Sequence, residues 1–152
     1  MPNSNQTLPV RVSPLLPINN QFIVDCNGLR LQQRPALSVI QVLAFAKQPE
    51  ATAKAITQAL GVECPIKPSV CNSGEGVQVT WNGPNNWMVI SEADDSILGK
   101  LQKAIGDLAA VVDQSHGRCG LRLSGVHARK VMAKNCALDF HPEFFKAGDS
   151  AL

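Results

Sequence analysis

The chain has 152 residues, of which 45% are hydrophobic and 17% are charged, and this is enough for one domain with a buried core. Its net charge is +2 and its lysines and arginines are dispersed, which argues against a nucleic-acid-binding surface. No run approaches the ~18 apolar residues that span a bilayer, and no signal peptide precedes the first prolines. We therefore expect a cytoplasmic protein with neither nucleic acid nor a membrane as a partner.

The cysteines are odd in number and form no Cys-x-x-Cys motif. We expect reduced, buried thiols, as in cytoplasmic proteins. Cys119 and Cys136 lie on faces that are apolar in the predicted elements. Cys64 and Cys71 flank a proline-rich loop, but the sequence near them lacks the two further ligands that a zinc site needs.

The first part of the chain, residues 1–34, is polar and rich in proline. Only short apolar pieces such as residues 22–24 interrupt it. We expect an extended arm, which either is a disordered terminus or lies along a partner.

Residues 36–60 predict a strand followed by a helix. Residues 36–45 are apolar on both faces, which indicates a central strand covered on both sides. Pro49 suits the first turn of the helix, and Gly61 suits its end.

Residues 62–113 predict the rest of one unit. Residues 62–76 are expected to be a loop. A strand over 77–81 alternates as an edge strand does, and a turn over 82–86 leads to a central strand over 87–90. A helix that begins at Asp94 or Asp95 and a short strand over 109–112 complete the order βαββαβ. The fold class is therefore α+β, with a ferredoxin-like unit over about residues 36–113.

Residues 118–135 predict a strand and helix that open a second, incomplete unit of this kind. Cys119, Leu121 and Leu123 alternate with polar residues, and Ser124 can cap the helix that follows. The predicted apolar stripe of this helix consists of Ala128, Val131, Met132 and Cys136. Arg129, Lys130 and Lys134 lie on its other faces, either as solvated surface or as partners of acidic patches on another protein.

The polar residues do not predict an active site. Asp113, Ser115 and His116 are too close in an extended segment to form a catalytic triad, so we expect turn residues that bond the local backbone. His116, His127 and His141 do not have the spacing of metal ligands, and no glycine-rich phosphate loop occurs. We therefore predict no catalytic residue, cofactor site or metal site in this chain. Trp81 and Trp87 are expected to pack in the core and the hairpin, although a tryptophan at a loop edge is also a common interface anchor.

Several motifs together carry a family resemblance, which covers roughly residues 31–142. They are Asp113-Gln-Ser-His-Gly-Arg118, Leu121-Arg-Leu-Ser-Gly125, Cys136-Ala-Leu-Asp-Phe-His-Pro142 and the hairpin Trp81-Asn-Gly-Pro-Asn-Asn-Trp87. The combination resembles the gamma subunit of heterotetrameric sarcosine oxidase. The Ser124-Gly-x-x-Ala128 entry into a helix also occurs in the wider folate-binding family of the glycine-cleavage T-protein.

The resemblance implies a gamma-like α+β domain over residues 35–152, with a role in assembly and stability. In that family the whole complex oxidatively demethylates sarcosine to glycine and gives hydrogen peroxide and 5,10-methylenetetrahydrofolate. FAD, FMN, NAD and zinc are then expected on the alpha, beta and delta subunits, and none in this chain. The candidate contacts with those subunits are His116, Arg118, Arg129, Lys130, Lys134 and Trp87.

Two alternatives stay open at this stage. The chain could be a stand-alone folate-binding or aminomethyltransferase-like module, which requires a pocket with acidic and aromatic groups for a pterin. Family members also run on with further strands and a helix after the region that corresponds to residue 142. This chain is therefore naturally short, is a fragment, or receives the missing strands from a partner.

Overall fold

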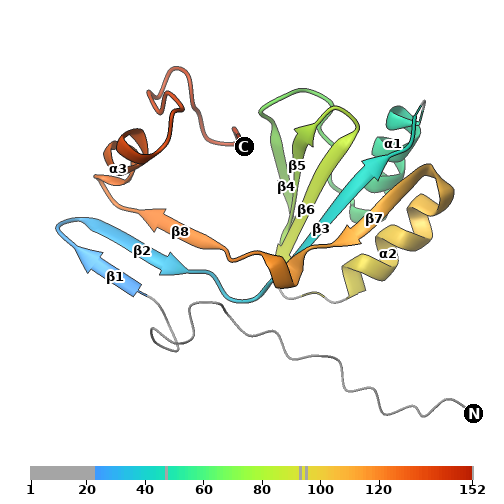
Figure 1. Cartoon of the computed structure of the whole chain (residues 1–152), viewed down its shortest axis with the longest axis horizontal. Coiled ribbons are helices and arrows are strands. Elements are labelled where there is room, and N and C mark those ends of the chain that lie inside the picture. The colour runs from blue at the N-terminus through green and yellow to red at the C-terminus, as the bar shows by residue number, and fades with distance from the viewer. Residues whose placement is uncertain (1–22, 47, 93, 95, 152) are drawn as a thin grey trace, which may run out of the picture.

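A computed structural model of the protein describes residues 23–46, 48–92, 94 and 96–151. Within them the strands form two antiparallel sheets, a five-stranded sheet in the order β4-β5-β6-β3-β7 and a three-stranded sheet in the order β1-β2-β8 (Figure 1). Most of the predicted N-terminal arm, residues 1–22, lies outside the described residues. No helix in the described part of the chain is long and apolar enough to cross a membrane.

The five-stranded sheet and its two helices form what we call the body. The order predicted from the sequence is confirmed, because β3 lies between β6 and β7 and pairs with both in the antiparallel sense, as in a ferredoxin-like unit. Its elements are β3 (Leu37–Ala44), α1 (Pro49–Leu60), β4 (Cys71–Gly74), β5 (Val77–Gly83), β6 (Asn86–Glu92), α2 (Ser96–Ile105), the short helix η1 (Gly106–Leu108) and β7 (Ala109–Asp113).

Local sequence signals fix both ends of α1 and the start of α2. Pro49 occupies the first turn of α1, where a missing backbone N–H costs nothing. Gly61 ends α1 in the left-handed region with φ 67°, and its N–H donates to Thr57 O at 2.9 Å. At the start of α2, Asp94 Oδ1 accepts from the hydroxyl of Ser96 at 2.6 Å and from its N–H at 2.9 Å, and these bonds lower the pKa of the Asp94 carboxyl.

The core of the protein lies between the body sheet and its helices. Both helices cover the same face of the sheet (Figure 1). Burial of that face removes a large apolar area from water, which stabilises the body. The largest fully buried apolar side chains are Ile40 and Val42 of β3, Ile56 of α1, Val79 of β5, Val89 of β6, and Ile97, Leu101 and Ile105 of α2.

The other face of the body sheet, which we call the open face, corrects a prediction. We expected β3 to be covered on both faces, but Leu43 and Val112 are exposed, and Phe45 just beyond β3 is 51% exposed. The reason is that no helix of the body packs on this face. The apolar residues predicted β3 as a central strand, which is right, but its second face is covered only in part, since Val39 is buried there and Leu43 is exposed.

A second correction concerns the edge of the body sheet. Residues 71–74 belong to β4 and not to a loop, so β5 is an inner strand and not the edge. Cys71-Asn-Ser-Gly lacks alternating apolar residues and therefore gives no strand signal. Its pairing with β5 depends on the tight turn at Glu75 and Gly76, where Gly76 has φ 72°.

The three-stranded sheet, helix α3 and the segment after it form what we call the second module, residues 23–34 and 118–151. It consists of β1 (Ile23–Cys26), β2 (Leu29–Gln33), β8 (Leu121–Ser124) and α3 (Ala128–Asn135). Residues 23–33 therefore form a hairpin and not an extended arm. Asn27 and Gly28 make its two-residue turn with φ 48° and 75°, the combination that suits the twist of a hairpin. β2 supplies the neighbour of β8, which the sequence left without a partner.

Ser124 does not cap α3, which is a third correction. The helix begins at Ala128, and its preceding residue His127 makes no side-chain cap. Gly125 between them has φ 107°, and a Cβ there would lie 2.1 Å from Gly28 O. The chain has to pass close to the hairpin turn at this point, so the helix starts later than the Ser124 signal suggests.

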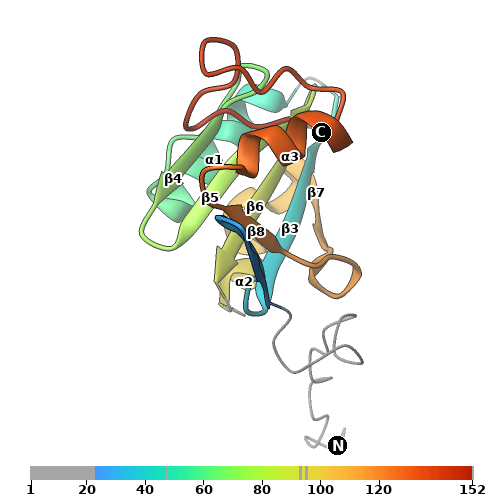
Figure 2. The ribbon, with the colours of Figure 1, turned by 90° about the vertical axis from the view of Figure 1, so that its left-hand side faces the viewer.

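The second module has no core of its own. None of residues 23–34 and 118–151 is buried, and Val126 is 85% exposed. The module stands on the side of the open face, away from α1 and α2 (Figure 2). Its C-terminal end returns to the body, where Cys71 N donates to Gly148 O and Ser150 N donates to Ser69 O, both at 3.0 Å.

Candidate partner interface

Asp113 and Ser115 fix the connection between the body and the second module. Ser115 belongs to the short helix η2 (Ser115–Gly117), and its Oγ accepts from the N–H of Val39 at 2.9 Å. Asp113 Oδ1 accepts from the N–H of Ser115 at 2.8 Å and from the Ser115 hydroxyl. The Asp113–Ser115 bonds are local turn bonds of the kind that the sequence predicted, whereas the Ser115–Val39 bond joins distant parts of the chain. Because the hydroxyl proton points to Asp113, Ser115 is not arranged as a nucleophile activated by the exposed His116.

We expect Ser115→Ala to lower the free energy of unfolding by about 1–3 kcal/mol, because the buried N–H of Val39 would lose its acceptor. Urea denaturation followed by circular dichroism measures this change. Ser124→Ala is the matched control, since Ser124 is exposed and caps nothing, and it should change stability by less than about 0.5 kcal/mol. Equal effects of the two substitutions would contradict the role given to Ser115.

A row of polar side chains crosses the open face and ends at the second module. Gln41 Nε2 donates to Asn86 Oδ1 at 3.1 Å, and Gln114 Nε2 donates to Gln41 Oε1. Arg118 Nε then donates to Gln114 Oε1 at 2.9 Å. The row uses one edge of the Arg118 guanidinium, so its two Nη groups keep no partner among the described residues.

Two of the predicted contact residues have structural roles. Trp87 is 3% exposed, and its Nε1 donates to Pro65 O at 2.7 Å, so it packs in the core and offers no surface to a partner. Arg129 donates from Nη1 to Phe140 O at 2.6 Å and to Phe145 O at 3.0 Å. It therefore holds the C-terminal segment against α3.

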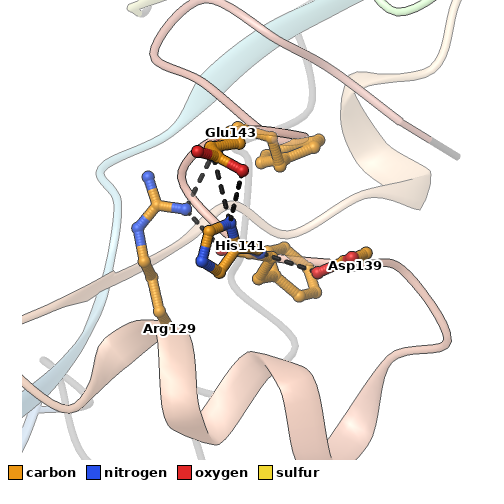
Figure 3. A network of polar contacts seen from close by, with 6 residues as sticks. Arg129, Asp139, His141 and Glu143 are labelled. Atoms are coloured by element: carbon orange, nitrogen blue, oxygen red, sulfur yellow. Dashed lines mark hydrogen bonds and ion pairs between the residues drawn. The ribbon is translucent and has the colours of Figure 1, made fainter.

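The loop after α3 forms a small polar network around Arg129 (Figure 3). Asp139 Oδ1 accepts from the N–H of His141 at 2.8 Å, and His141 O accepts from the N–H groups of Phe144 and Phe145, both at 2.9 Å. His141 Nδ1 lies 3.9 Å from Glu143 Oε2 on the exposed side. Residues 142–144 form a turn in this loop.

The remaining predicted contacts lie on the surface of the chain. His116 and Arg118 are exposed beside the open face, and Lys130 and Lys134 are exposed one turn apart on α3. Like charges at this spacing on a helix repel each other slightly, so an opposite charge from outside would be favourable there. The structure does not bring these residues together into one cluster with a titratable nucleophile.

A hollow of about 250 Å³ lies between α3 and the C-terminal segment. This is below the roughly 300–1,000 Å³ of typical ligand sites. It offers no acidic side chain to hold a pterin, so it does not favour the folate-binding alternative. Its lining consists of Leu123, Ala128, Met132, Phe140, Phe145 and Ala147 with the cationic Arg129 and Lys146.

The cysteines do not form a metal site in the described residues, where no group of three or more possible ligands comes together. All five thiols are free. The expectation that they are buried holds for Cys64 but is wrong for Cys26 and Cys119, which are exposed. The three-stranded sheet is the reason, because no described part of the chain buries the strand that carries Cys26 or the loop that carries Cys119.

Cys64 should resist alkylation in the folded protein. Burial raises its pKa from the ordinary 9.0 to about 12, so the thiol stays protonated at pH 8. Mass spectrometry after a short iodoacetamide pulse should find label on Cys26 and Cys119 at least ten times sooner than on Cys64, and equal labelling in urea. Because the folded pKa is raised, this thiol's contribution to stability is complete below pH 9.0 and is lost as the pH rises toward 12. Rapid labelling of native Cys64 would contradict its burial.

The fold and its surfaces define an α+β protein with a ferredoxin-like body and a basic, uncovered second module. The model of the sarcosine oxidase, gamma subunit family matches residues 45–151. This match covers most of the chain and both of its parts. The chain therefore belongs to the sarcosine oxidase gamma subunit family.

Individual relatives agree with the family match. The chain is 34% identical over 116 residues to the sarcosine oxidase subunit gamma of Arthrobacter sp., which covers 70% of this chain and 57% of the relative. It is 35% identical over 102 residues to that of Corynebacterium sp. strain P-1, which covers 66% of this chain and 47% of the relative. The chain thus spans about half the length of the relatives that it matches.

A solved structure has the same fold. A chain of the heterotetrameric sarcosine oxidase from Corynebacterium sp. U-96, in complex with pyrrole 2-carboxylate, matches with a TM-score of 0.72 and 27% sequence identity. The match covers 80% of this chain and 62% of that chain. It confirms the fold class and the resemblance noted in the sequence.

Proposed function

We propose that this chain acts as the gamma subunit of a heterotetrameric sarcosine oxidase and serves assembly and stability rather than catalysis. The complex would oxidatively demethylate sarcosine to glycine and give hydrogen peroxide and 5,10-methylenetetrahydrofolate. The observation that carries the proposal is the family match over residues 45–151, which runs from the end of β3 through the rest of the body and the C-terminal part of the second module.

The burial pattern supports a role within a larger assembly. A module without a buried residue gains little stability from its own packing, so cover from another protein would stabilise it. Alpha, beta and delta subunits are the proposed partners. His116, Arg118, Arg129, Lys130 and Lys134 are the proposed contacts, whereas Trp87 is left out because it is 3% exposed and its Nε1 donates to Pro65 O.

The same proposal assigns the cofactors to the partner subunits, with FAD, FMN, NAD and zinc outside this chain. The side chains weighed as a catalytic triad support this assignment, since Asp113 and Ser115 bond each other and Ser115 accepts from the backbone N–H of Val39. The five free cysteines are what a protein of the reducing cytoplasm would carry.

Co-expression of the tagged chain with the three other subunits of the oxidase tests the proposal. We expect the tag to recover all four subunits together, with flavin absorbance and sarcosine-dependent peroxide production. Omission of this chain should reduce the amount of assembled oxidase more than the turnover per flavin of what remains.

Two results would contradict the proposal. Recovery of the tagged chain alone, with the other subunits assembled without it, would show that it is not their partner. Tight binding of tetrahydrofolate by the purified chain in isothermal titration calorimetry would favour the stand-alone folate-binding module.

A further inference from the structure

The charges of this chain are divided between its two parts. The second module carries eight lysines and arginines against four carboxylates, and the body carries five lysines against eight carboxylates. All the arginines of the described residues lie in the second module, whereas the cations of the body are lysines. Arginine is enriched at protein interfaces and lysine is depleted there, so this division singles out the second module.

Three of these arginines share one face of the three-stranded sheet. Arg122 of β8 lies directly opposite Gln32 of β2, and Arg30 lies two residues before Gln32 on the same face. The N–H of Arg34 donates to Gly120 O at 2.8 Å, which continues the pairing and places Arg34 in the same row. We call Arg30, Arg34 and Arg122 the arginine face.

The opposite face of this sheet is already in use. Leu31 and Leu123 point to it in register, and Leu123 lines the hollow beneath α3. The arginine face therefore looks away from α3, and Arg30 and Arg122 are exposed on it, whereas Arg34 is half-buried beside the body.

Among the described residues, the body supplies one carboxylate to the arginine face and leaves the other two guanidinium groups without an ion pair. Arg34 Nη2 lies 2.9 Å from Glu92 Oε1 at the end of β6. Among the described residues, neither Arg30 nor Arg122 has an ion pair, although Asp25 lies opposite Arg30 in the β1–β2 register. Arg30 and Arg122 are diagonal neighbours on adjacent strands, roughly 7–8 Å apart, so their positive charges repel each other. A negatively charged group from another molecule would therefore be favourable beside them.

We propose that the arginine face docks onto a carboxylate-bearing surface of another subunit of the oxidase. Guanidinium groups bind carboxylates through two parallel hydrogen bonds, and the Arg34–Glu92 pair is an example within this chain. The acidic body next to the face opposes a long polyanion, which favours a protein over a nucleic acid. This inference rests on the proposed function and adds the surface and the chemistry of the partner.

The test compares two full-length variants with equal changes in charge. The first is the double variant Arg30→Glu/Arg122→Glu, which reverses the charge of two of the three residues on the arginine face. Lys54→Glu with Lys103→Glu reverses two exposed lysines on the helices of the body and is the matched control. Biolayer interferometry measures the affinity of each variant for the subcomplex of the three other subunits, at 50 and 200 mM salt.

We expect the Arg30→Glu/Arg122→Glu variant to bind the subcomplex at least tenfold more weakly than the unmodified chain. Its affinity should also depend much less on salt, while the affinity of the control stays within twofold of that of the unmodified chain. Arg30→Gln with Arg122→Gln should show a smaller loss, and it replaces the Glu variant if circular dichroism finds that variant unfolded. Equal binding by the Glu variant and the unmodified chain would overturn the inference and leave the proposed function standing.

Two other outcomes have separate meanings. No binding by the unmodified chain would overturn the proposed function itself. Tighter binding of a 20-base-pair DNA duplex than of the subcomplex, lost on reversal of the arginine face, would overturn the protein partner in favour of a nucleic acid.

Discussion

Leu101→Ala should lower the free energy of unfolding by about 3–5 kcal/mol, the largest stability change expected for a single substitution in this chain. Leu101 is fully buried in α2, at the centre of the core between the helices and the body sheet. Its truncation removes apolar contacts and leaves a cavity that the packed neighbours can fill only in part. Urea denaturation followed by circular dichroism measures the change.

Leu121→Ala is the control for this prediction. Leu121 in β8 is 52% exposed, so the same loss of atoms should cost less than about 1 kcal/mol. A cost for Leu121→Ala similar to that for Leu101→Ala would mean that the second module has a core of its own, contrary to the burial described above.

Backbone amides of the second module should exchange with solvent at least about 1,000 times faster than those of the body when the chain is alone. The hydrogen bonds of β2 and β8 are not covered by buried side chains, so local opening costs little. Those of β3 and β6 lie against the buried core and should open only with global unfolding. Hydrogen–deuterium exchange with mass spectrometry compares peptides that cover residues 29–33 and 86–92.

The same measurement with the other subunits present should slow exchange over residues 29–33 and leave residues 86–92 almost unchanged. The reason is that a partner which binds the closed form of the second module raises the free energy of local opening there by the free energy of binding. Equal protection of both segments in the free chain would contradict the account of an uncovered module.

The arrangement of the body could be predicted from the sequence because its signals are local. Pro49 and Gly61 mark the ends of α1 through backbone geometry that needs no tertiary information. The turn before Trp87 and the apolar stripe of α2 behave in the same way, and together they give the order βαββαβ. The prediction that β3 lies inside the sheet followed from its apolar residues.

Other features had a signal that the sequence analysis missed. Asn27-Gly28 between two short segments that contain apolar residues is a strong short-range signal of a hairpin, and it indicates β1 and β2 within the segment predicted as an extended arm. The arginine face follows from that hairpin, since Arg30 and Arg34 share a face once β2 is recognised as a strand.

The remaining features depend on contacts far apart in the sequence. The polar residues of β4 form a strand only because β5 pairs with them. Gly125 meets the hairpin turn at Gly28, about a hundred residues earlier, and this contact moves the start of α3 beyond Ser124. Trp87 resembled an interface anchor in the sequence, but Pro65 O accepts its indole N–H inside the core.

The most direct test of the account is native mass spectrometry of the four subunits expressed together. We predict one assembly that contains one copy of this 16.3 kDa chain and that loses it on reversal of Arg30 and Arg122 to glutamate. A complete, active oxidase whose mass excludes this chain, beside a free 16.3 kDa monomer, would contradict the claim that the chain is a structural subunit.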